Sequence, residues 1–178
     1  AWPQAIKKGR VLNFDKKSSE AVRLPDILIQ DSDRSVLEMF LSGMQEVTDT
    51  EVYYIAQGLP PKLTSLSLSF EGCIAITDDG LNYLADRVET LPLQKLFLDF
   101  GGCKLLTDAS ISYLSTRLPS TLVDLSLQFA LIPNISKSGA KSLADNLPVS
   151  VSRLRTTFRG TQFDHQFDTV KQFKKMTR

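Results

Sequence analysis

The sequence predicts a curved α/β solenoid in which short parallel strands line one side and helices cover the other. Three observations predict this class. A pattern of apolar residues recurs about every 29 residues, the apolar spacing inside each interval changes from that of a strand to that of a helix, and a proline follows each helical stretch. A strand followed by a helix, repeated along the chain, gives a parallel sheet.

The strand half of the repeat is anchored by apolar residues at fixed positions. In the first strong copy, Leu66, Leu68 and Phe70 alternate along the chain, so they share one face of a strand. The anchors of the four clearer copies are Leu63, Leu66, Leu68 and Phe70; Leu93, Leu96, Leu98 and Phe100; Leu122, Leu125, Leu127 and Phe129; and Val151, Leu154, Thr156 and Phe158. One step earlier, Leu37, Met39 and Leu41 form a further weak copy, so the sequence predicts about five repeats.

The helix half of the repeat begins at a residue that suits a helix N-cap. Apolar residues follow each cap with the spacing of one helical stripe, which predicts an amphipathic helix of about three turns. The predicted caps are Thr48, Thr77, Thr107 and Ser136. The stretch TDTE from Thr48 to Glu51 predicts a capping box, and Asp49, Asp78 and Asp108 place a negative charge in the first turn. Pro60, Pro92, Pro119 and Pro148 end the helices.

Each repeat can bury its apolar face only against its neighbours, so the repeats must stack. We expect an N-terminal cap or extension over 1–33, a repeat domain over 34–160 and an amphipathic basic cap or tail over 161–178. The stretch RLPDILIQ, 23–30, is a candidate for an additional edge strand.

The segments LTSLSLSFEGCIAITDDGL (63–81) and LVDLSLQFALI (122–132) resemble leucine-rich repeats. The run from Cys73 to Leu81 is similar to the cysteine-containing subtype, which is known from substrate-recognition subunits of ubiquitin ligases. The additional strand position at Phe70, Phe100 and Phe129 is closer to Phe-bearing variants common in protist proteins. The resemblance implies a solenoid with a concave strand face that binds proteins.

Composition narrows the classes of function. The 178 residues carry a net charge of +1, which gives no reason to expect binding to nucleic acid. No apolar run approaches the roughly 18 residues of a membrane-spanning helix, and the start AWPQAIKKGR has no stretch of signal-peptide length. Two cysteines do not make a disulfide framework, so we expect an intracellular protein, either cytoplasmic or organellar (mitochondrion or plastid). The missing initiator Met leaves open that an N-terminal segment has been removed.

No residue pattern predicts catalysis, and we expect the protein not to be an enzyme, with no cofactor and no metal. Cys73 and Cys103 occupy the same place in adjacent repeats, where a disulfide, a metal site or simple burial are the alternatives. Met44, Ile132 and Thr161 share that place, which favours burial in the core. The Thr-Asp pairs are explained by helix capping, and His165 by a solvated position in a polar tail.

The candidate site is the outward face of the strands. Side chains that alternate with the core residues point onto the concave surface. The predicted partner-binding residues are Glu38, Phe40, Lys95, Phe97, Asp99, Asp124, Gln128, Arg153 and Arg155. Phe40 and Phe97 are apolar where solvation asks for polar residues, and exposed aromatic residues beside charges are typical of binding hot spots.

The C-terminal stretch is a second candidate contact. Phe163, Phe167, Val170 and Phe173 have helical spacing and lie among lysines, which fits either a cap over the last repeat or a basic anchor for an acidic partner or a membrane surface. The sequence thus predicts a non-catalytic protein–protein interaction or scaffold module. The alternatives are a permanent accessory subunit of a large multiprotein complex, organellar if a leader was removed, and the substrate-recognition part of a ubiquitin ligase.

Overall fold

The computed structural model describes residues 11–13 and 32–177, and within these residues a single sheet of seven strands runs the length of the molecule. The strands follow chain order and are β1 (Val11–Asn13), β2 (Val36–Phe40), β3 (Ser65–Ser69), β4 (Lys95–Asp99), β5 (Asp124–Gln128), β6 (Arg153–Thr157) and β7 (Gln166–Phe167). Strands β1 to β6 pair in parallel, and β7 pairs antiparallel with β6.

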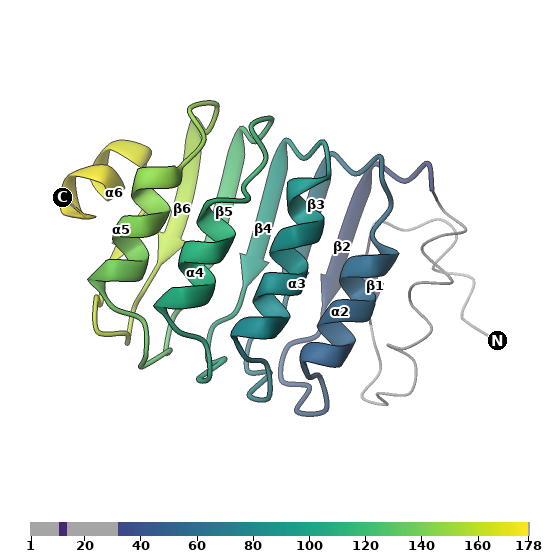
Figure 1. The fold of residues 1–178 in the computed structure, drawn as a ribbon, viewed down its shortest axis with the longest axis horizontal. Helices are drawn as coiled ribbons and strands as arrows, with labels where there is room; N and C mark the ends of the chain where they lie inside the picture. The colour runs from purple at the N-terminus through teal and green to yellow at the C-terminus, as the bar shows by residue number, and fades with distance from the viewer. Residues whose placement is uncertain (1–10, 14–31, 178) are drawn as a thin grey trace.

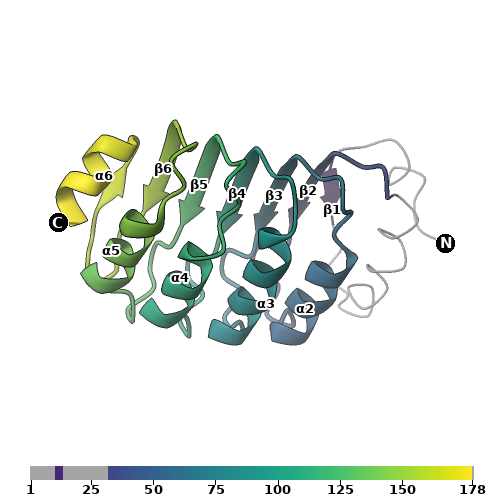
Figure 2. The same ribbon diagram turned by 45° about the horizontal axis from the view of Figure 1, so that its top comes forward.

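Helices cover one face of this sheet and leave the other face open, as Figures 1 and 2 show. The helices are α2 (Asp49–Gly58), α3 (Asp78–Glu89), α4 (Asp108–Ser115), α5 (Lys137–Asn146) and α6 (Val170–Thr177). All four predicted caps are N-caps whose side-chain oxygen accepts from a backbone N–H in the first turn, and the capping box of Thr48 and Glu51 is present. The predicted curved α/β solenoid is confirmed.

The core contains one file of stacked phenylalanines. The ring centroids are 5.1 Å apart for Phe70 and Phe100, 6.4 Å for Phe100 and Phe129, and 5.9 Å for Phe129 and Phe158. Phe173 of α6 continues the file at 6.1 Å from Phe158. The leucine anchors of the repeats are buried in parallel rows beside this file. Each apolar face is therefore covered by the next repeat.

The helix starts are also linked from one repeat to the next. The carboxylate of Asp78 in α3 accepts hydrogen bonds from the N–H and the hydroxyl of Thr107, the N-cap of α4, at 2.8 and 2.6 Å. Asp49 accepts the same pair from Thr77, and Asp108 accepts it from Ser136. These aspartates therefore do more than complement the dipole of their own helix.

The two ends differ from a simple run of repeats. Strand β1 was not predicted from the sequence, and the candidate edge strand at 23–30 lies outside the described residues. The predicted helical stripe from Phe163 to Phe173 is wrong in its first part, because Phe167 lies in β7 and the helix begins at Val170. As the last strand of the repeats, β6 would leave the backbone groups of one edge unpaired, and β7 pairs with part of that edge.

Candidate protein-binding face

The strand registers arrange the outward side chains of the sheet in three rows across the strands. The amino-end row contains Val36, Ser65, Lys95, Asp124 and Arg153; the middle row Glu38, Ser67, Phe97, Ser126 and Arg155; and the carboxyl-end row Phe40, Ser69, Asp99, Gln128 and Thr157. The residues between them, such as Leu66 and Leu68, are buried toward the helices. All nine sequence-predicted residues therefore lie on one continuous face, which we call the concave face.

Two aromatic side chains reach the surface of the concave face. Phe40 at the carboxyl end of β2 is 42% exposed. Phe97 in β4 is half-buried and lies between Ser67 of β3 and Ser126 of β5, its direct partners in the register. Both direct partners are small, so the side chains immediately across from Phe97 are too short to cover its ring.

The charges on β4 to β6 are unevenly paired. Asp124 forms an ion pair with Arg153, whose Nε lies 3.1 Å from Asp124 Oδ2, and it lies 3.9 Å from a terminal nitrogen of Arg155. The side chains of these arginines remain 64% and 67% exposed. Lys95 lies across from Asp124 in the register, is exposed, and has no ion pair within the described residues. We call Lys95, Arg153 and Arg155 the basic crescent.

A shallow cavity of about 160 Å³ opens on the concave face next to the basic crescent. Its walls combine hydroxyl groups, cations and the Phe97 ring. The lining residues are Ser65, Leu66, Ser67, Lys95, Leu96, Phe97, Asp124, Ser126 and Arg155. Four of the nine predicted residues, namely Lys95, Phe97, Asp124 and Arg155, line this cavity, whereas Glu38 and Phe40 lie outside it on the neighbouring strand β2, with Glu38 across from Ser67.

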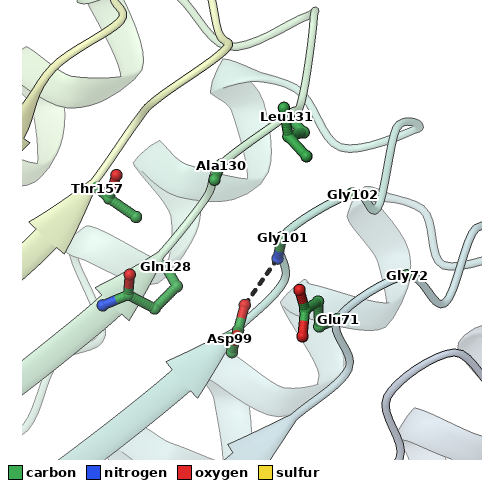
Figure 3. A pocket seen from close by; sticks show the side chains of 9 residues that line it. All are labelled: Glu71, Gly72, Asp99, Gly101, Gly102, Gln128, Ala130, Leu131 and Thr157. Carbon is green, nitrogen blue, oxygen red and sulfur yellow. Dashed lines mark hydrogen bonds between the residues drawn. The ribbon is translucent and has the colours of Figure 1, made fainter.

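A larger cavity of about 320 Å³ lies at the carboxyl ends of the strands (Figure 3). It contains the predicted Asp99 and Gln128 together with Glu71 and Leu131, which the sequence analysis did not single out. Burial raises the pKa of Asp99, the Gly101 N–H that donates to Asp99 Oδ1 at 2.9 Å opposes this rise, and the charge of Glu71 adds to it. Because Asp99 and Glu71 are both acidic, this cavity disfavours the binding of an anionic ligand.

Leu131 differs from the other repeats at a turn position that the apolar spacing does not include. Its φ is +60°, and it occupies the turn position at which the other repeats have Gly43, Gly72, Gly102 and Gly160, all with positive φ. The side chain is 64% exposed and projects at the rim of the larger cavity (Figure 3). Comparing the repeats position by position would have identified this residue.

Exposed tyrosines on the helices form a surface that the sequence analysis also missed. Tyr53 in α2 and Tyr83 in α3 are 40% and 42% exposed, and their ring centroids are 5.2 Å apart in an edge-to-face contact. Further along, Tyr113 donates to Asp86 at 2.8 Å and lies under the guanidinium of Arg117. The convex side therefore carries its own aromatic patch.

The two thiols are free and buried. Cys73 Sγ donates to the Leu41 carbonyl, and Cys103 Sγ donates to the Phe70 carbonyl, each at 3.2 Å. Burial raises the pKa of Cys73 to about 11, and burial together with the neighbouring Cys73 raises that of Cys103 to about 12. The interpretation of the cysteines as core residues is confirmed.

The other chemical candidates can be placed as well. Within the described residues, no group of three or more His, Cys, Asp or Glu side chains is arranged to hold a metal ion. His165 is exposed, but its ring stacks on Phe163 with centroids 4.7 Å apart, so it is held more firmly than the predicted solvated position implies. No helix in the described part of the chain has both the length and the apolar character required to cross a membrane.

Comparison with solved structures identifies the fold. The protein-family models and the curated protein sequences contain no match to this chain. A chain in the crystal structure of the Rad7 and Elc1 complex in yeast matches with a TM-score of 0.61 and 22% identity, over 85% of this chain and 37% of that one. The leucine-rich repeat-containing protein LegL7 from Legionella pneumophila matches with a TM-score of 0.51 and 14% identity, over 94% and 62%.

The fold is a leucine-rich repeat solenoid. At these identities the matches show the fold and not the activity. The chain spans about a third of the matched chain in the yeast complex and about three fifths of LegL7. The strands of the solenoid build the concave face, and the helices α2 to α5 build the convex side.

Proposed function

We propose that the protein is a non-catalytic interaction module that binds a protein partner through its concave face. The observation that carries this proposal is Phe97, an aromatic side chain that the core does not use, flanked by small residues and placed beside cations. Aromatic residues and arginines dominate binding hot spots because they bury a large area at little conformational cost. The complex of Rad7 and Elc1, in which a similar solenoid occurs, is consistent with such a role.

Within this proposal, residues 34–160 form the binding domain and 161–178 form a cap over its last repeat. The stack of Phe173 on Phe158 supports the cap, because the apolar side of α6 is used in the core and is not free for a membrane surface. We assign the repeats to the cysteine-containing, Phe-bearing variant, since Cys73, Cys103 and the phenylalanine file fill equivalent core positions.

The partner-binding role has three forms: a free adaptor, a permanent subunit of a larger complex, and a substrate-recognition part of a ubiquitin ligase. The exposed pair Tyr53 and Tyr83 on the convex side favours the permanent subunit, because a buried subunit contacts neighbours on more than one side. Size-exclusion chromatography of a native extract separates these forms. A permanent subunit elutes only at the mass of a complex, an adaptor also elutes alone, and a ligase subunit co-elutes with the ligase.

The experiment is capture of partners from source cells by the tagged protein, compared with the variant Phe97→Ala. We expect the variant to capture about tenfold less partner, or less still, while its unfolding temperature stays the same as that of the native protein. The matched control is Leu105→Ala, which removes a 51% exposed apolar side chain from the segment between β4 and α4 and should capture normally. Equal capture by Phe97→Ala and Leu105→Ala, or no captured protein at all, would overturn the proposal.

A further inference from the structure

The concave face has a local excess of positive charge on β4 to β6. Three cations, the basic crescent of Lys95, Arg153 and Arg155, surround one carboxylate, Asp124. Both arginines are mostly exposed, so their pairing with Asp124 contributes little and can be rearranged at small cost. Lys95 has no anionic partner within the described residues. The site therefore has charge left over for an external anion.

Hydrogen-bond donors lie beside these cations. The hydroxyls of Ser65 and Ser67 line the cavity of about 160 Å³ and make no side-chain hydrogen bond among the described residues. Ser126 Oγ accepts from Gln128 Nε2 at 3.2 Å, so its own hydroxyl proton is not used in that bond and can be donated to a ligand. Carboxylate oxygens accept from hydroxyls and cations together, and such charge-assisted bonds are stronger than neutral ones.

Phe97 adds an apolar surface to the same cavity. Phe97 lies in the middle row between Ser67 and Ser126, and it lines the same cavity as Lys95 and Arg155. A partner residue that packs on this ring brings its sequence neighbours within reach of the basic crescent. The larger cavity, in contrast, contains Glu71 and Asp99 and repels anions. In the middle row, Glu38 lies across from Ser67 and also disfavours an anion on that side. Charge therefore directs an acidic group to the amino-end row, where Lys95 and Arg153 flank Asp124.

We infer that the concave face binds an acidic segment of a protein partner, with an apolar side chain on Phe97 and an adjacent carboxylate held by Lys95, Arg155 and the cavity serines. This inference rests on the proposed function and specifies the partner's chemistry. The contacts of the carboxylate with Lys95 and Arg155 are electrostatic and exposed to solvent, so the affinity falls as salt is added. Arg153 acts from the neighbouring position by neutralising Asp124, which leaves Arg155 available.

The test measures fluorescence anisotropy of three short labelled peptides with the full chain at low salt. One peptide alternates Asp with Leu, the second replaces each Asp by Lys, and the third replaces each Asp by Ser. We expect the acidic peptide to bind at least about tenfold more tightly than the other two, and its affinity to fall with added salt. Lys95→Glu with Arg155→Glu should weaken the acidic peptide by about tenfold or more.

Two further variants make the result specific. Lys95→Gln with Arg155→Gln removes the charges without adding acids beside Asp124, so it stays informative where charge reversal disturbs folding. The control Lys104→Glu with Lys171→Glu changes the same number of charges at exposed residues, one between β4 and α4 and one on α6, and should leave binding unchanged. Stronger binding of the basic peptide, or equal binding of the acidic peptide to all variants, would overturn the inference.

The same variants separate this inference from the proposed function. If Phe97→Ala loses the cellular partner and Lys95→Gln with Arg155→Gln retains it, the concave face binds a partner that is not acidic. If both variants retain the partner, the proposed function itself fails.

Discussion

At the scale of single residues, the first-turn aspartates explain how one repeat positions the next. Asp49, Asp78 and Asp108 each accept from the N-cap of the following helix, about 29 positions further on. In α2 the carboxylate of Glu51 fills the same role for Thr48 from within the helix. A Cβ on Gly80 would overlap with Asp49 Oδ1, so glycine at that position permits the close approach.

We predict that Asp78→Ala destabilises the protein more than Asp79→Ala does. Both residues lie in the first turn of α3 and share its dipole, but only Asp78 accepts the two bonds from Thr107. Loss of those bonds should lower the free energy of unfolding by about 1–3 kcal/mol. The Asp79→Ala substitution, at an exposed residue, should lower it by less than about 1 kcal/mol. Urea unfolding measures both, and equal losses would show that the link between repeats adds nothing.

The buried thiols make stability depend on pH in the alkaline range. A thiol whose pKa is raised by folding keeps its proton in the folded state while the unfolded state loses it, so stability is complete below about pH 9 and falls as the pH rises. The folded values of about 11 for Cys73 and about 12 for Cys103 place this loss between pH 9 and 12.

We predict that unfolding free energy drops more between pH 8 and pH 10 in the native protein than in the double variant Cys73→Ala with Cys103→Ala. The difference should be about 2–3 kcal/mol, since each thiol contributes about 1.4 kcal/mol per pH unit. Urea unfolding at the two pH values measures it, and the double variant accounts for all other groups that titrate there. Parallel pH profiles would contradict the burial of the thiols.

At the scale of elements, α6 differs from the repeat helices. It follows β7, and its Phe173 is fully buried against Phe158, while its lysines remain on the outer side. The helix thereby closes a phenylalanine file whose last member would otherwise face water. Its position depends on β7, which turns the chain back along β6.

We predict that Phe173→Ala costs about 3–5 kcal/mol of stability, as expected for removal of a buried aromatic ring. The control on the same helix is Met176→Ala, which removes a 43% exposed side chain and should cost less than about 1 kcal/mol. Thermal and urea unfolding measure both variants. If the two variants were equally stable, α6 would not be a cap.

At the scale of the whole molecule, much of the architecture could be predicted because its signals are local. The caps, the helical stripes and the alternating strand residues follow from spacing within one repeat, and stacking follows from the apolar face that each repeat cannot bury alone. The ends could not be predicted in the same way. Strand β1 and strand β7 pair with a neighbouring strand through backbone groups, and such pairing leaves little trace in so few residues.

The sequence predicted which side chains share the candidate face, but it did not predict the contacts between them. The alternation of side chains placed all nine predicted residues on one face. It did not show that Arg153 and Arg155 share Asp124, that Lys95 has no ion pair among the residues that the structure describes, or that Glu71 joins Asp99 in a second cavity. These relations depend on side-chain positions across strands.

The sequence by itself determined the repeat, the two faces of the sheet and the absence of any residue pattern that predicts catalysis. Those features arise from backbone periodicity, which a strand or helix imposes over a few residues. Only the tertiary structure decided which charges neutralise one another and which remain available to a partner. Residues about 29 positions apart become neighbours on stacking, and their distances depend on how closely the repeats pack.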